Sequence, residues 1–482
     1  MRFLCLPLLL LAVLFQVETG RSTEPPIKCR LKLVRLEPLP PGKNCPENEI
    51  LLRSVRGQYF SNDLQQAKND FSRVVQREPT KYHAAHPFRA VAKFGGRKYG
   101  FVLDKQTANS KGYDRLYFDL NGNGDLTDDV PIDVPKDSKT TESVRSENGW
   151  TGTFYLFPRV DFRIHAAGTE WDYSFFLRSI NNSRHEKELT SYARLYSAAY
   201  RQGEITLGGR KHTIILVDRN TNGRFDVLVG FASDGRGDAG FVSQYGTEIL
   251  FDPDILIDKP LGYGYITEHR LFLARMNALG GRFCKIKVTP GGDELTCTPV
   301  AAPIGKITVP QPLCNVWLIN EQGFLALDLR NDTPVAIPAG KWHLTYFTLG
   351  HDEKNGQVTE QKQMNNKSPS DKVVQHATKD TAIREDAGSE SPVIRYMSAS
   401  CGNVCEPITI IAGQTTMLKV GPPYTPTLTV TTQGKVASLG LEVRGIGQET
   451  IYFLSGSPPP KPSFTITDPQ GKVVEQGDFE YG

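Results

Sequence analysis

The chain has 482 residues, 39% of them hydrophobic, so it is long enough for roughly three domains and apolar enough to build cores. This composition excludes an intrinsically disordered protein. Its 56 basic and 53 acidic residues leave a formal charge of only +3, which argues against nucleic acid as a partner because no strong positive field surrounds the chain.

The N-terminal residues have the features of a secretory signal. Met1-Arg2-Phe3 gives a charged start, and the apolar run from Leu4 to Val17 is too short to span a bilayer comfortably. We therefore predict a signal peptide over residues 1–22 and a mature protein that is secreted, periplasmic or on the cell surface, with an uncleaved anchor as the alternative. No later segment is apolar enough to cross a membrane and no heptad pattern follows, so we expect a monomer.

The segment 23–87 is predicted to contain a strand and a helix. Residues 27–39 alternate basic and apolar side chains before a Pro-rich turn, as a strand does. Between Asn62 and Arg77 the apolar residues follow a single helical stripe, and Pro79 marks the end of the helix. These stripe residues are Leu64, Ala67, Phe71, Val74 and Val75.

Residues 88–258 are predicted to form a β domain, because short aromatic and branched runs alternate with Gly, Asn and Asp turns. Within it, oxygen-bearing side chains recur at alternate positions from Asp119 to Asp129. A hard cation such as Ca²⁺ takes about six to eight oxygen ligands, and a curling chain supplies them in this way. The candidate ligands of this stretch, loop 1, are Asp119, Asn121, Asn123, Asp125 through its carbonyl, Thr127 directly or through water, and Asp128 or Asp129.

Loop 1 resembles a calcium loop, with Gly124 where the EF-hand loop makes its sharp turn. The twelfth EF-hand position, normally a bidentate acid, is Val130, so the loop is more similar to the shortened calcium loops of thrombospondin type 3 repeats and integrin-type blades. A polar Asn-Gly turn without metal is the alternative.

A second stretch, loop 2, repeats the spacing of loop 1 and ends with an acid at the ninth position. Its candidate metal ligands are Asp218, Asn220, Asn222, Arg224 at the position of Asp125, and Asp226. Because Arg219 and Arg224 offset the two acidic charges, we expect loop 2 to be the weaker site. Related Gly-Gly-Arg-Lys segments at 95–98 and 208–211 precede the two loops, which suggests a duplicated hairpin-plus-loop unit.

The remainder of the chain is predicted to be mainly β. Residues 259–350 contain a hairpin in which Cys284 and Cys297 stand opposite each other if the turn centres on Pro290-Gly291, a geometry compatible with a disulfide; a slip of one residue removes it. Residues 351–398 are polar and predict a mobile insertion. Residues 399–482 resume strands typical of a sandwich. For Cys401 and Cys405, a local disulfide and two free thiols are both favoured over a metal site.

Several motifs in this half resemble known families. The stretch Ile337-Pro-Ala-Gly-Lys-Trp-His-Leu344 is similar to the strand entry of carboxypeptidase-regulatory-like sandwiches, so the expected fold is a calcium-loop β domain followed by sandwich domains of that type or of Ig-like type. The paired loops, Lys419-Val-Gly-Pro-Pro423, Phe464-Thr-Ile-Thr-Asp-Pro-Gln-Gly-Lys-Val-Val474 and Phe479-Glu-Tyr-Gly482 together resemble predicted secreted bacterial proteins of unknown function. That resemblance implies no known activity.

Local signatures of hydrolases are absent from the sequence: there is no Gly-x-Ser-x-Gly, no His-Glu-x-x-His and no phosphate-binding Gly-rich loop. We therefore expect a calcium-binding β-protein with a structural, surface or adhesion role, whose partners are extracellular polysaccharides or proteins. Two alternatives stay open. Trp150, Trp171 and Trp342 can stack on sugars in a carbohydrate-binding module. A hydrolase can join distant acids, with Asp234, Asp238, Asp252 and Asp254 as candidates.

Overall fold

The protein is represented by a computed structural model, which describes residues 24–37, 57–61, 65–136, 141–145, 150–166, 168–184, 187–229, 231–232, 241–242, 247–251, 270–311, 313–330, 333–351, 395–401, 405–434, 436–453 and 461–480. The predicted signal peptide and residues 352–394 of the predicted polar insertion lie outside the described residues. The mainly β fold is confirmed, since nearly all described elements are strands in mostly antiparallel sheets. The helix α2 (Gln65–Val74) lies inside the segment where the sequence predicts a helix.

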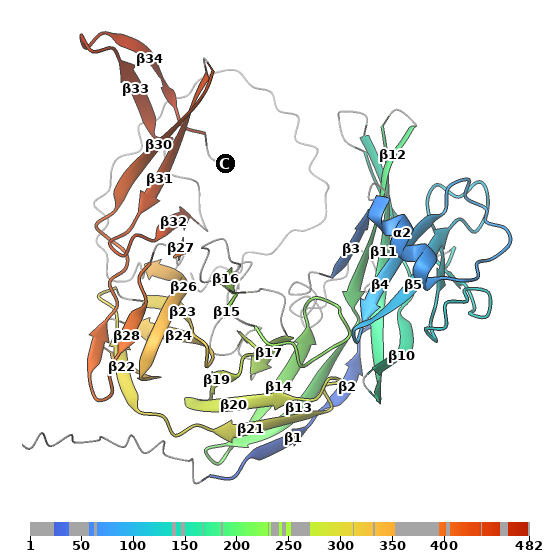
Figure 1. The fold of residues 1–482 in the computed structure, drawn as a ribbon, viewed down its shortest axis with the longest axis horizontal. Coiled ribbons are helices and arrows are strands. Elements are labelled where there is room, and N and C mark those ends of the chain that lie inside the picture. The colour runs from blue at the N-terminus through green and yellow to red at the C-terminus, as the bar shows by residue number, and fades with distance from the viewer. Residues whose placement is uncertain are drawn as a thin grey trace, which may run out of the picture.

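The first sheet carries loop 1 and is covered on one side by α2 (Figure 1). Its strands, in spatial order, are β4 (Phe88–Phe94), β5 (Arg97–Asp104), β6 (Arg115–Phe118) and β7 (Ile132–Asp133). The β4–β5 turn uses Gly95 and Gly96 at φ +61° and +86°, the left-handed conformation that a two-residue hairpin turn requires. Phe71 and Val75 from the helix segment bury against Val102 of β5, which fixes α2 beside loop 1.

A second sheet packs its aromatic side chains against the first. Its strands are β3 (Gln58–Ser61), β12 (Lys187–Ser197), β11 (Thr169–Arg184), β9 (Trp150–Leu156) and β8 (Thr141–Arg145), and β10 (Val160–Ala166) pairs with the first half of β11. The Phe94 ring lies 5.1 Å from Phe162 and 5.3 Å from Phe175, centroid to centroid. Aromatic pairs at this distance contribute energy beyond their buried area.

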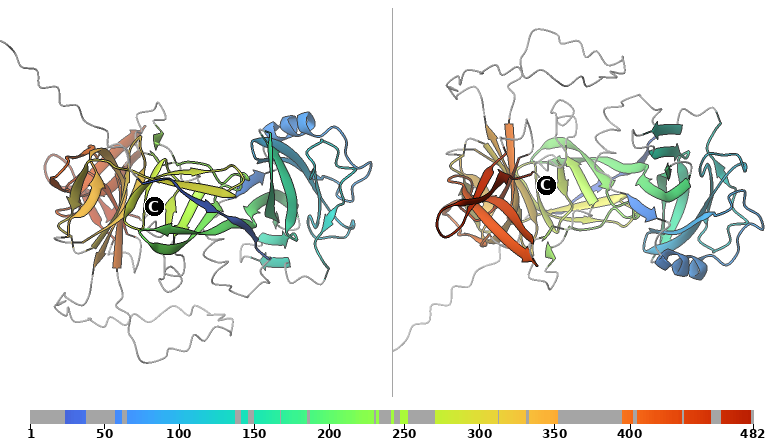
Figure 2. Two further views of the ribbon diagram at one scale, coloured as in Figure 1. Left: turned by 90° about the horizontal axis from the view of Figure 1, so that it is seen from below. Right: turned by 90° about the horizontal axis from the view of Figure 1, so that it is seen from above.

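Two further sheets lie between the N-terminal and C-terminal parts of the molecule (Figures 1 and 2). One contains β18 (Arg270–Phe272), β17 (Thr247–Phe251), β14 (Arg210–Asp218), β13 (Ala199–Leu207) and β2 (Lys32–Arg35). The other contains β1 (Ile27–Arg30), β21 (Glu294–Pro299), β20 (Arg282–Val288) and β19 (Met276–Leu279). A small ribbon pairs β15 (Phe231–Ala232) with β16 (Phe241–Val242). Apart from this ribbon, the four sheets described so far contribute to one continuous core.

The C-terminal part has a second core around the fully buried Trp342. Its main sheet contains β24 (Phe324–Arg330), β23 (Leu313–Ile319), β26 (Gly340–His351), β27 (Arg395–Ser400), β32 (Thr450–Phe453), β31 (Val436–Arg444) and β30 (Thr425–Gln433), with β28 (Ile408–Ile410) beside β26. A smaller sheet contains β25 (Val335–Pro338), β22 (Ile304–Thr308) and β29 (Thr415–Met417), and a hairpin joins β33 (Ser463–Thr467) to β34 (Val473–Asp478). The Ig-like or carboxypeptidase-regulatory-like assignment stays a prediction.

The β20–β21 hairpin exists as predicted, but its register differs. Val288 pairs with Leu295, so the turn centres on Gly291-Gly292, and Cys284 stands opposite Pro299 while Cys297 stands opposite Ile286. The predicted direct opposition of the two cysteines is therefore wrong, because the turn is centred one residue later in the chain and includes Asp293. Cys284 and Cys297 are free thiols, as are Cys29 and Cys314, whereas Cys401 and Cys405 form a disulfide. Cys45 lies outside the described residues.

Strand pairing joins distant parts of the sequence. β1 pairs with β21, β2 with β13 and β3 with β12, so strands from the predicted segment 23–87 complete sheets made of much later residues. The predicted domain limits stay predictions. Among the described residues, we find no helix that combines the length and apolar character needed to cross a membrane.

Candidate metal centre

Loop 1 begins at Asp119, directly after β6, and its carboxylate organises the turn that follows. Oδ1 accepts a hydrogen bond from the Asn123 N–H and Oδ2 from the Gly124 N–H, both at 3.0 Å. Asp119 is only 1% exposed. A carboxylate has about four lone-pair positions, so these two bonds leave capacity for a cation on the same oxygens.

The alternate side chains of loop 1 form a chain of short turns. The Asn121 Oδ1 accepts from the Asn123 N–H at 2.9 Å, and the Asn123 Oδ1 accepts from the Asp125 N–H at 2.7 Å. The Asp125 Oδ1 then accepts from the Thr127 N–H at 2.9 Å. Each of these oxygens thereby accepts from the N–H two residues further along the chain, which is the hydrogen bond of an Asx turn.

Asp128 and Asp129 lie at the end of loop 1 and fold back onto its beginning. The Asp128 Oδ2 accepts from the Asn123 Nδ2 at 2.7 Å and from the Asn121 Nδ2 at 3.3 Å. The Asp129 Oδ2 accepts from the Leu120 N–H at 3.1 Å. The structure thus brings the candidate ligands at both ends of loop 1 together.

Burial, and to a lesser extent the neighbouring acids, shift the pKa values of the carboxylates in loop 1. Burial, followed by the nearby charges of Asp128 and Asp119, raises the pKa of Asp129 to about 6. Burial also raises the pKa of Asp119, although the N–H groups of the turn oppose this. By contrast, the hydroxyl and N–H of Thr127 hold the pKa of Asp125 below its usual range. A cation favours the charged form of every one of these acids.

The segment that follows α2 fixes the position of loop 1. The Gly124 carbonyl accepts hydrogen bonds from the N–H groups of Gln76 at 2.8 Å and Arg77 at 3.2 Å, and the Leu126 N–H donates to the Arg77 carbonyl at 3.0 Å. Leu126 is 1% exposed, within the cluster that holds the helix. The carbonyl end of α2 therefore lies against the loop, an end that favours positive charge by about 0.3–1 kcal/mol.

Loop 2 repeats the turn of loop 1. The Asp218 carboxylate accepts from the Asn222 N–H at 3.3 Å and the Gly223 N–H at 2.7 Å, the counterparts of Asn123 and Gly124. The links from Asn220 Oδ1 to the Asn222 N–H and from Asn222 Oδ1 to the Arg224 N–H repeat as well, at 3.2 and 2.9 Å. The same two positions have positive φ in each loop: Gly122 and Gly124, and Thr221 and Gly223.

The carboxylates of loop 2 are bound by other protein groups to a greater extent than those of loop 1. Asp226 makes a two-point ion pair with the Arg224 guanidinium, at 2.8 and 2.6 Å, and the Asp218 Oδ2 accepts from the Tyr173 hydroxyl at 2.7 Å. Burial raises the pKa of Asp218 to about 6. Loop 2 therefore provides fewer uncommitted carboxylate oxygens than loop 1.

Loop 2 also holds neighbouring sheets together. The Asn222 carbonyl accepts from the Gly95 N–H at 2.7 Å, and the Gly223 carbonyl accepts from the Trp171 indole at 2.8 Å. The buried Thr221 keeps its left-handed conformation while its hydroxyl accepts from the Ser197 N–H at 3.0 Å. These contacts connect the end of β14 with the β4–β5 turn and with β11.

Within the described ranges, no three His, Cys, Asp or Glu side chains converge as metal ligands. The ligand set of loop 1 also includes Asn and backbone carbonyl oxygens, which suit calcium. In the present geometry the Asn121 and Asn123 amides donate to Asp128, so a bound cation would take the place of these donors.

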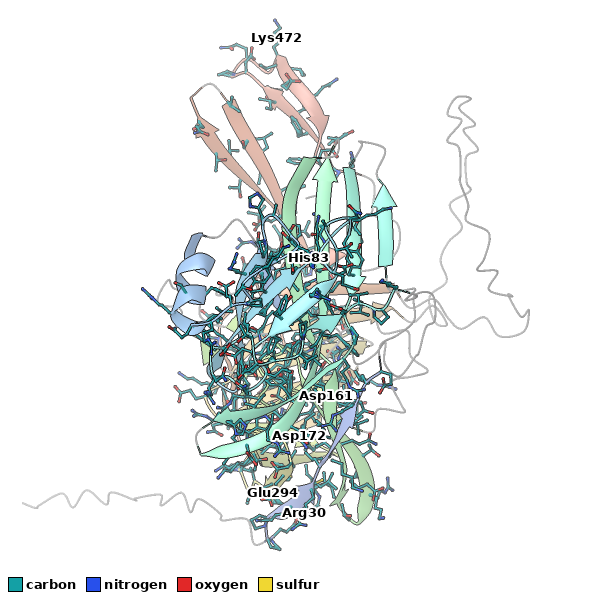
Figure 3. All side chains as sticks on the ribbon, turned by 90° about the vertical axis from the view of Figure 1, so that its right-hand side faces the viewer. Arg30, His83, Asp161, Asp172, Glu294 and Lys472 are labelled. Atoms are coloured by element: carbon teal, nitrogen blue, oxygen red, sulfur yellow. A yellow bond between two sulfur atoms is a disulfide. The ribbon has the colours of Figure 1, made fainter. Side chains whose placement is uncertain are left out.

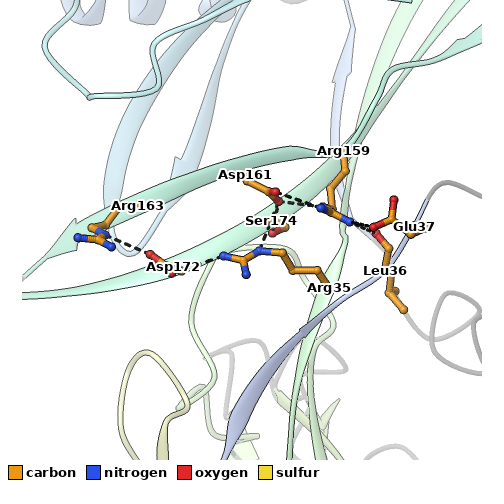
Figure 4. A network of polar contacts seen from close by, with 8 residues as sticks. All are labelled: Arg35, Leu36, Glu37, Arg159, Asp161, Arg163, Asp172 and Ser174. Carbon is orange, nitrogen blue, oxygen red and sulfur yellow. Dashed lines mark hydrogen bonds and ion pairs between the residues drawn. The ribbon is translucent and has the colours of Figure 1, made fainter.

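A cleft of about 570 Å³ lies near loop 2, between β2, the β10–β11 hairpin, β13 and the β20–β21 turn. A chain of ion pairs starts among the lining residues, where Arg163 contacts Asp172 at 3.1 Å and Arg35 contacts Asp172 at 3.4 Å. It continues beyond the cleft, where Arg35 contacts Asp161 at 3.6 Å and Arg159 contacts Asp161 at 2.9 Å and also Glu37 (Figure 4). Asp161 and Asp172 stand on the adjacent strands β10 and β11 (Figure 3). The lining residues are Leu33, Arg35, Arg163, Thr169, Glu170, Trp171, Asp172, Arg201, Thr289, Pro290, Gly291 and Asp293.

Of the tryptophans considered for sugar stacking, Trp171 lines the cleft but is only 7% exposed and donates its indole N–H to the Gly223 carbonyl, and Trp342 has no exposed surface. The Trp150 side chain and the four candidate acids Asp234, Asp238, Asp252 and Asp254 lie outside the described residues. Sequence reasoning missed Arg201. A signal was present, since Arg201 shares the buried face of β13 with Ala199 and Ile205.

Comparison with protein-family models, curated proteins and solved structures finds no match to this chain. The resemblance to secreted bacterial proteins with calcium loops therefore stays a prediction, and the site itself has to support any function assigned.

Proposed function

We propose that the protein is an exported calcium-binding β-protein in which Ca²⁺ at loop 1 stabilises the N-terminal sheets for a structural, surface or adhesion role. The observation that carries this proposal is the accumulation of four carboxylates, those of Asp119, Asp125, Asp128 and Asp129, in one short loop whose side-chain oxygens accept hydrogen bonds from its own N–H groups. Oxygen ligands in this number and kind suit a hard cation.

The raised pKa of Asp129 supports the same proposal, since burial and the neighbouring acids disfavour its charged form and a divalent cation would be a counterion that favours it. Arg77, 2.9 Å from Asp125, partly fills that role at the exposed edge. In loop 2, Arg224 is the counterion of Asp226, and the Tyr173 hydroxyl donates a hydrogen bond to Asp218. The acids of loop 2 are therefore already compensated, and for this reason we place the functional site at loop 1.

Export is supported by the apolar N-terminal segment and by the Cys401–Cys405 disulfide, because disulfides persist in oxidising compartments. Extracellular calcium modules bind with dissociation constants of about 10⁻⁴–10⁻³ M. At ten times that concentration, the free energy of unfolding rises by about 1.4 kcal/mol.

Thermal melts of the mature protein in calcium and in EDTA test this function, with Asp119→Asn and Asp218→Asn as a matched pair. Both residues make the same two turn bonds, so both substitutions disturb a turn, but only Asp119→Asn is expected to abolish the calcium-dependent rise in melting temperature. Superimposable wild-type melts in calcium and EDTA would refute the proposal. A larger loss of the calcium response in Asp218→Asn would place the site at loop 2.

A further inference from the structure

The cleft beside loop 2 contains a buried arginine, Arg201, whose side chain makes no hydrogen bond or ion pair with the described residues. The Arg201 side chain lines the cleft and is only 8% exposed, and its Nε is buried without a hydrogen-bond partner. Its guanidinium lies over the Phe225 ring, 5.7 Å from the centroid. A buried donor on a charged group that lacks an acceptor costs free energy, and an acceptor from a bound ligand or water removes that cost.

The surrounding chain holds Arg201 in a fixed place. A β-carbon on Gly292 would lie 2.8 Å from the Arg201 Cγ and 2.7 Å from the Phe225 Cβ, so the β20–β21 turn packs directly against both side chains. The Phe225 N–H donates to the Pro290 carbonyl at 3.0 Å. The guanidinium is thus preorganised by loop 2 on one side and by the hairpin turn on the other.

The other two arginines of the cleft already have partners. Arg35 and Arg163 both contact Asp172, and Arg163 also lies 3.4 Å from Glu170. In the described structure, Arg201 makes no such ion pair within 4 Å, and the nearest acids act on it only through their charge, with Asp293 ahead of Asp172. Arg201 is therefore the donor that an incoming acidic group would meet.

The acids at the cleft limit the charge of its ligand. Glu170, Asp172 and Asp293 line the same space as the three arginines, so a ligand with several negative charges would be repelled. A ligand with one carboxylate and several hydroxyl groups suits it better, since Arg201 can bind the carboxylate in two-point fashion while the acids and Thr169 accept or donate to hydroxyls. The volume is in the range of small-molecule sites, which is about 300–1,000 Å³.

We propose that the cleft between β2, β11, β13 and the β20–β21 turn binds a uronic acid unit of an acidic polysaccharide, with its carboxylate on Arg201. This inference is independent of calcium at loop 1, because none of its contacts involves that loop. It assigns a ligand class to the proposed surface role.

Isothermal titration of the mature protein with D-glucuronate and with D-galacturonate tests the site, with D-glucose and D-galactose as uncharged counterparts and sulfate as an anion without a sugar. We expect uronate dissociation constants of about 1 mM. The neutral sugars and sulfate should bind at least about tenfold more weakly, because the neutral sugars lack the carboxylate and sulfate lacks the hydroxyl groups of the sugar ring. Sulfate binding equal to that of the uronates would identify a plain anion site and overturn the proposal, as would equal binding of neutral sugars or no binding of uronates.

Three variants locate the binding. Arg201→Gln should weaken uronate binding about tenfold or more, whereas Arg178→Gln, which changes an arginine over the Phe154 ring farther along β11, should leave it within about twofold. Thr169→Trp places a large side chain at the exposed edge of the cleft and should block binding without touching the core. If Arg201→Gln does not fold, Thr169→Trp decides alone, and unchanged uronate binding in Thr169→Trp would overturn the assignment.

Discussion

The Tyr173 hydroxyl donates a 2.7 Å hydrogen bond to the Asp218 carboxylate in the interior of the protein. Tyr173 has no exposed surface and Asp218 only 1%, so this bond ties the middle of β11 to the first residue of loop 2 with no water between them. It also gives a buried carboxylate one of the few donors that can stabilise its charge.

Removal of this donor should make stability more sensitive to pH. Burial raises the pKa of Asp218 to about 6, above its value in the unfolded chain. The protonated acid therefore contributes stability below about pH 4, and this contribution, on the order of 3 kcal/mol, is lost as the pH rises through about 6. Because Tyr173→Phe raises the pKa of Asp218 further, we expect it to lower the melting temperature more at pH 8 than at pH 5. Equal losses at both pH values would contradict this account.

Calcium binding at loop 1 should weaken as the pH falls through about 6. Asp129 has a pKa of about 6, so protons compete with the cation for this carboxylate. Without calcium, the protonated form of Asp129 contributes stability at low pH that is lost as the pH rises through 6, and calcium offsets this loss by favouring the charged form. Melts with calcium and with EDTA at pH 5 and pH 7.5 should differ only at the higher pH.

Asp129→Asn is the control for this pH dependence. It removes the titrating group, so its calcium-dependent rise in melting temperature should be smaller at pH 7.5 and should change less between pH 7.5 and pH 5. A wild-type pH profile in this variant would show that another acid of loop 1 controls binding.

The four described free cysteines should resist alkylation in the native protein. Cys29, Cys284, Cys297 and Cys314 are all buried. Burial raises the pKa of Cys29 and of Cys314, and the thiolate is the reactive form. Cys284 and Cys297 are diagonal neighbours across the hairpin, and a hydrogen bond between their thiols lowers the pKa of Cys284 and raises that of Cys297. Both thiols are free, and their burial keeps alkylating agents from either sulfur. Alkylation before and after unfolding, followed by peptide mass mapping, should show all four modified only after unfolding; a linked Cys284–Cys297 peptide would disprove this.

The turns of loops 1 and 2 and the helix α2 depend on residues that lie close together in the sequence. The turns of loops 1 and 2 follow from side chains two positions apart, and α2 follows from a stripe of adjacent helical turns. The predicted β20–β21 register was wrong, because the turn centres on Gly291-Gly292 and not on Pro290-Gly291. The spacing of residues alone does not fix the length of a turn. A register is set by the side chains that each face must bury.

The cleft was beyond sequence reasoning because its walls come from four separate parts of the chain. Arg35 meets Asp172 only because β2 adds to the edge of the sheet that contains β13. Likewise, the partner of Asp218 is Tyr173 on β11, a contact that depends on how two sheets pack. Such long-range contacts are properties of the fold and have no local signature.

Gly124→Ala should separate loop 1 from α2, and Gly96→Ala is its matched control. Both glycines have a left-handed backbone, with φ +81° and +86°, so both substitutions cost about 1–2 kcal/mol in backbone conformation. They differ in their surroundings: a β-carbon on Gly124 would lie 2.5 Å from the Val74 carbonyl, whereas one on Gly96 would meet nothing within 4 Å. We therefore expect Gly124→Ala to destabilise the protein by about 1–3 kcal/mol more than Gly96→Ala, as overpacking does. Because Leu126 leaves its buried place when the loop moves, hydrogen exchange should increase at Gln76 and Leu126 in Gly124→Ala alone. Equal melting temperatures for the two variants, with unchanged exchange at these amides, would show that the helix end does not hold loop 1 in place.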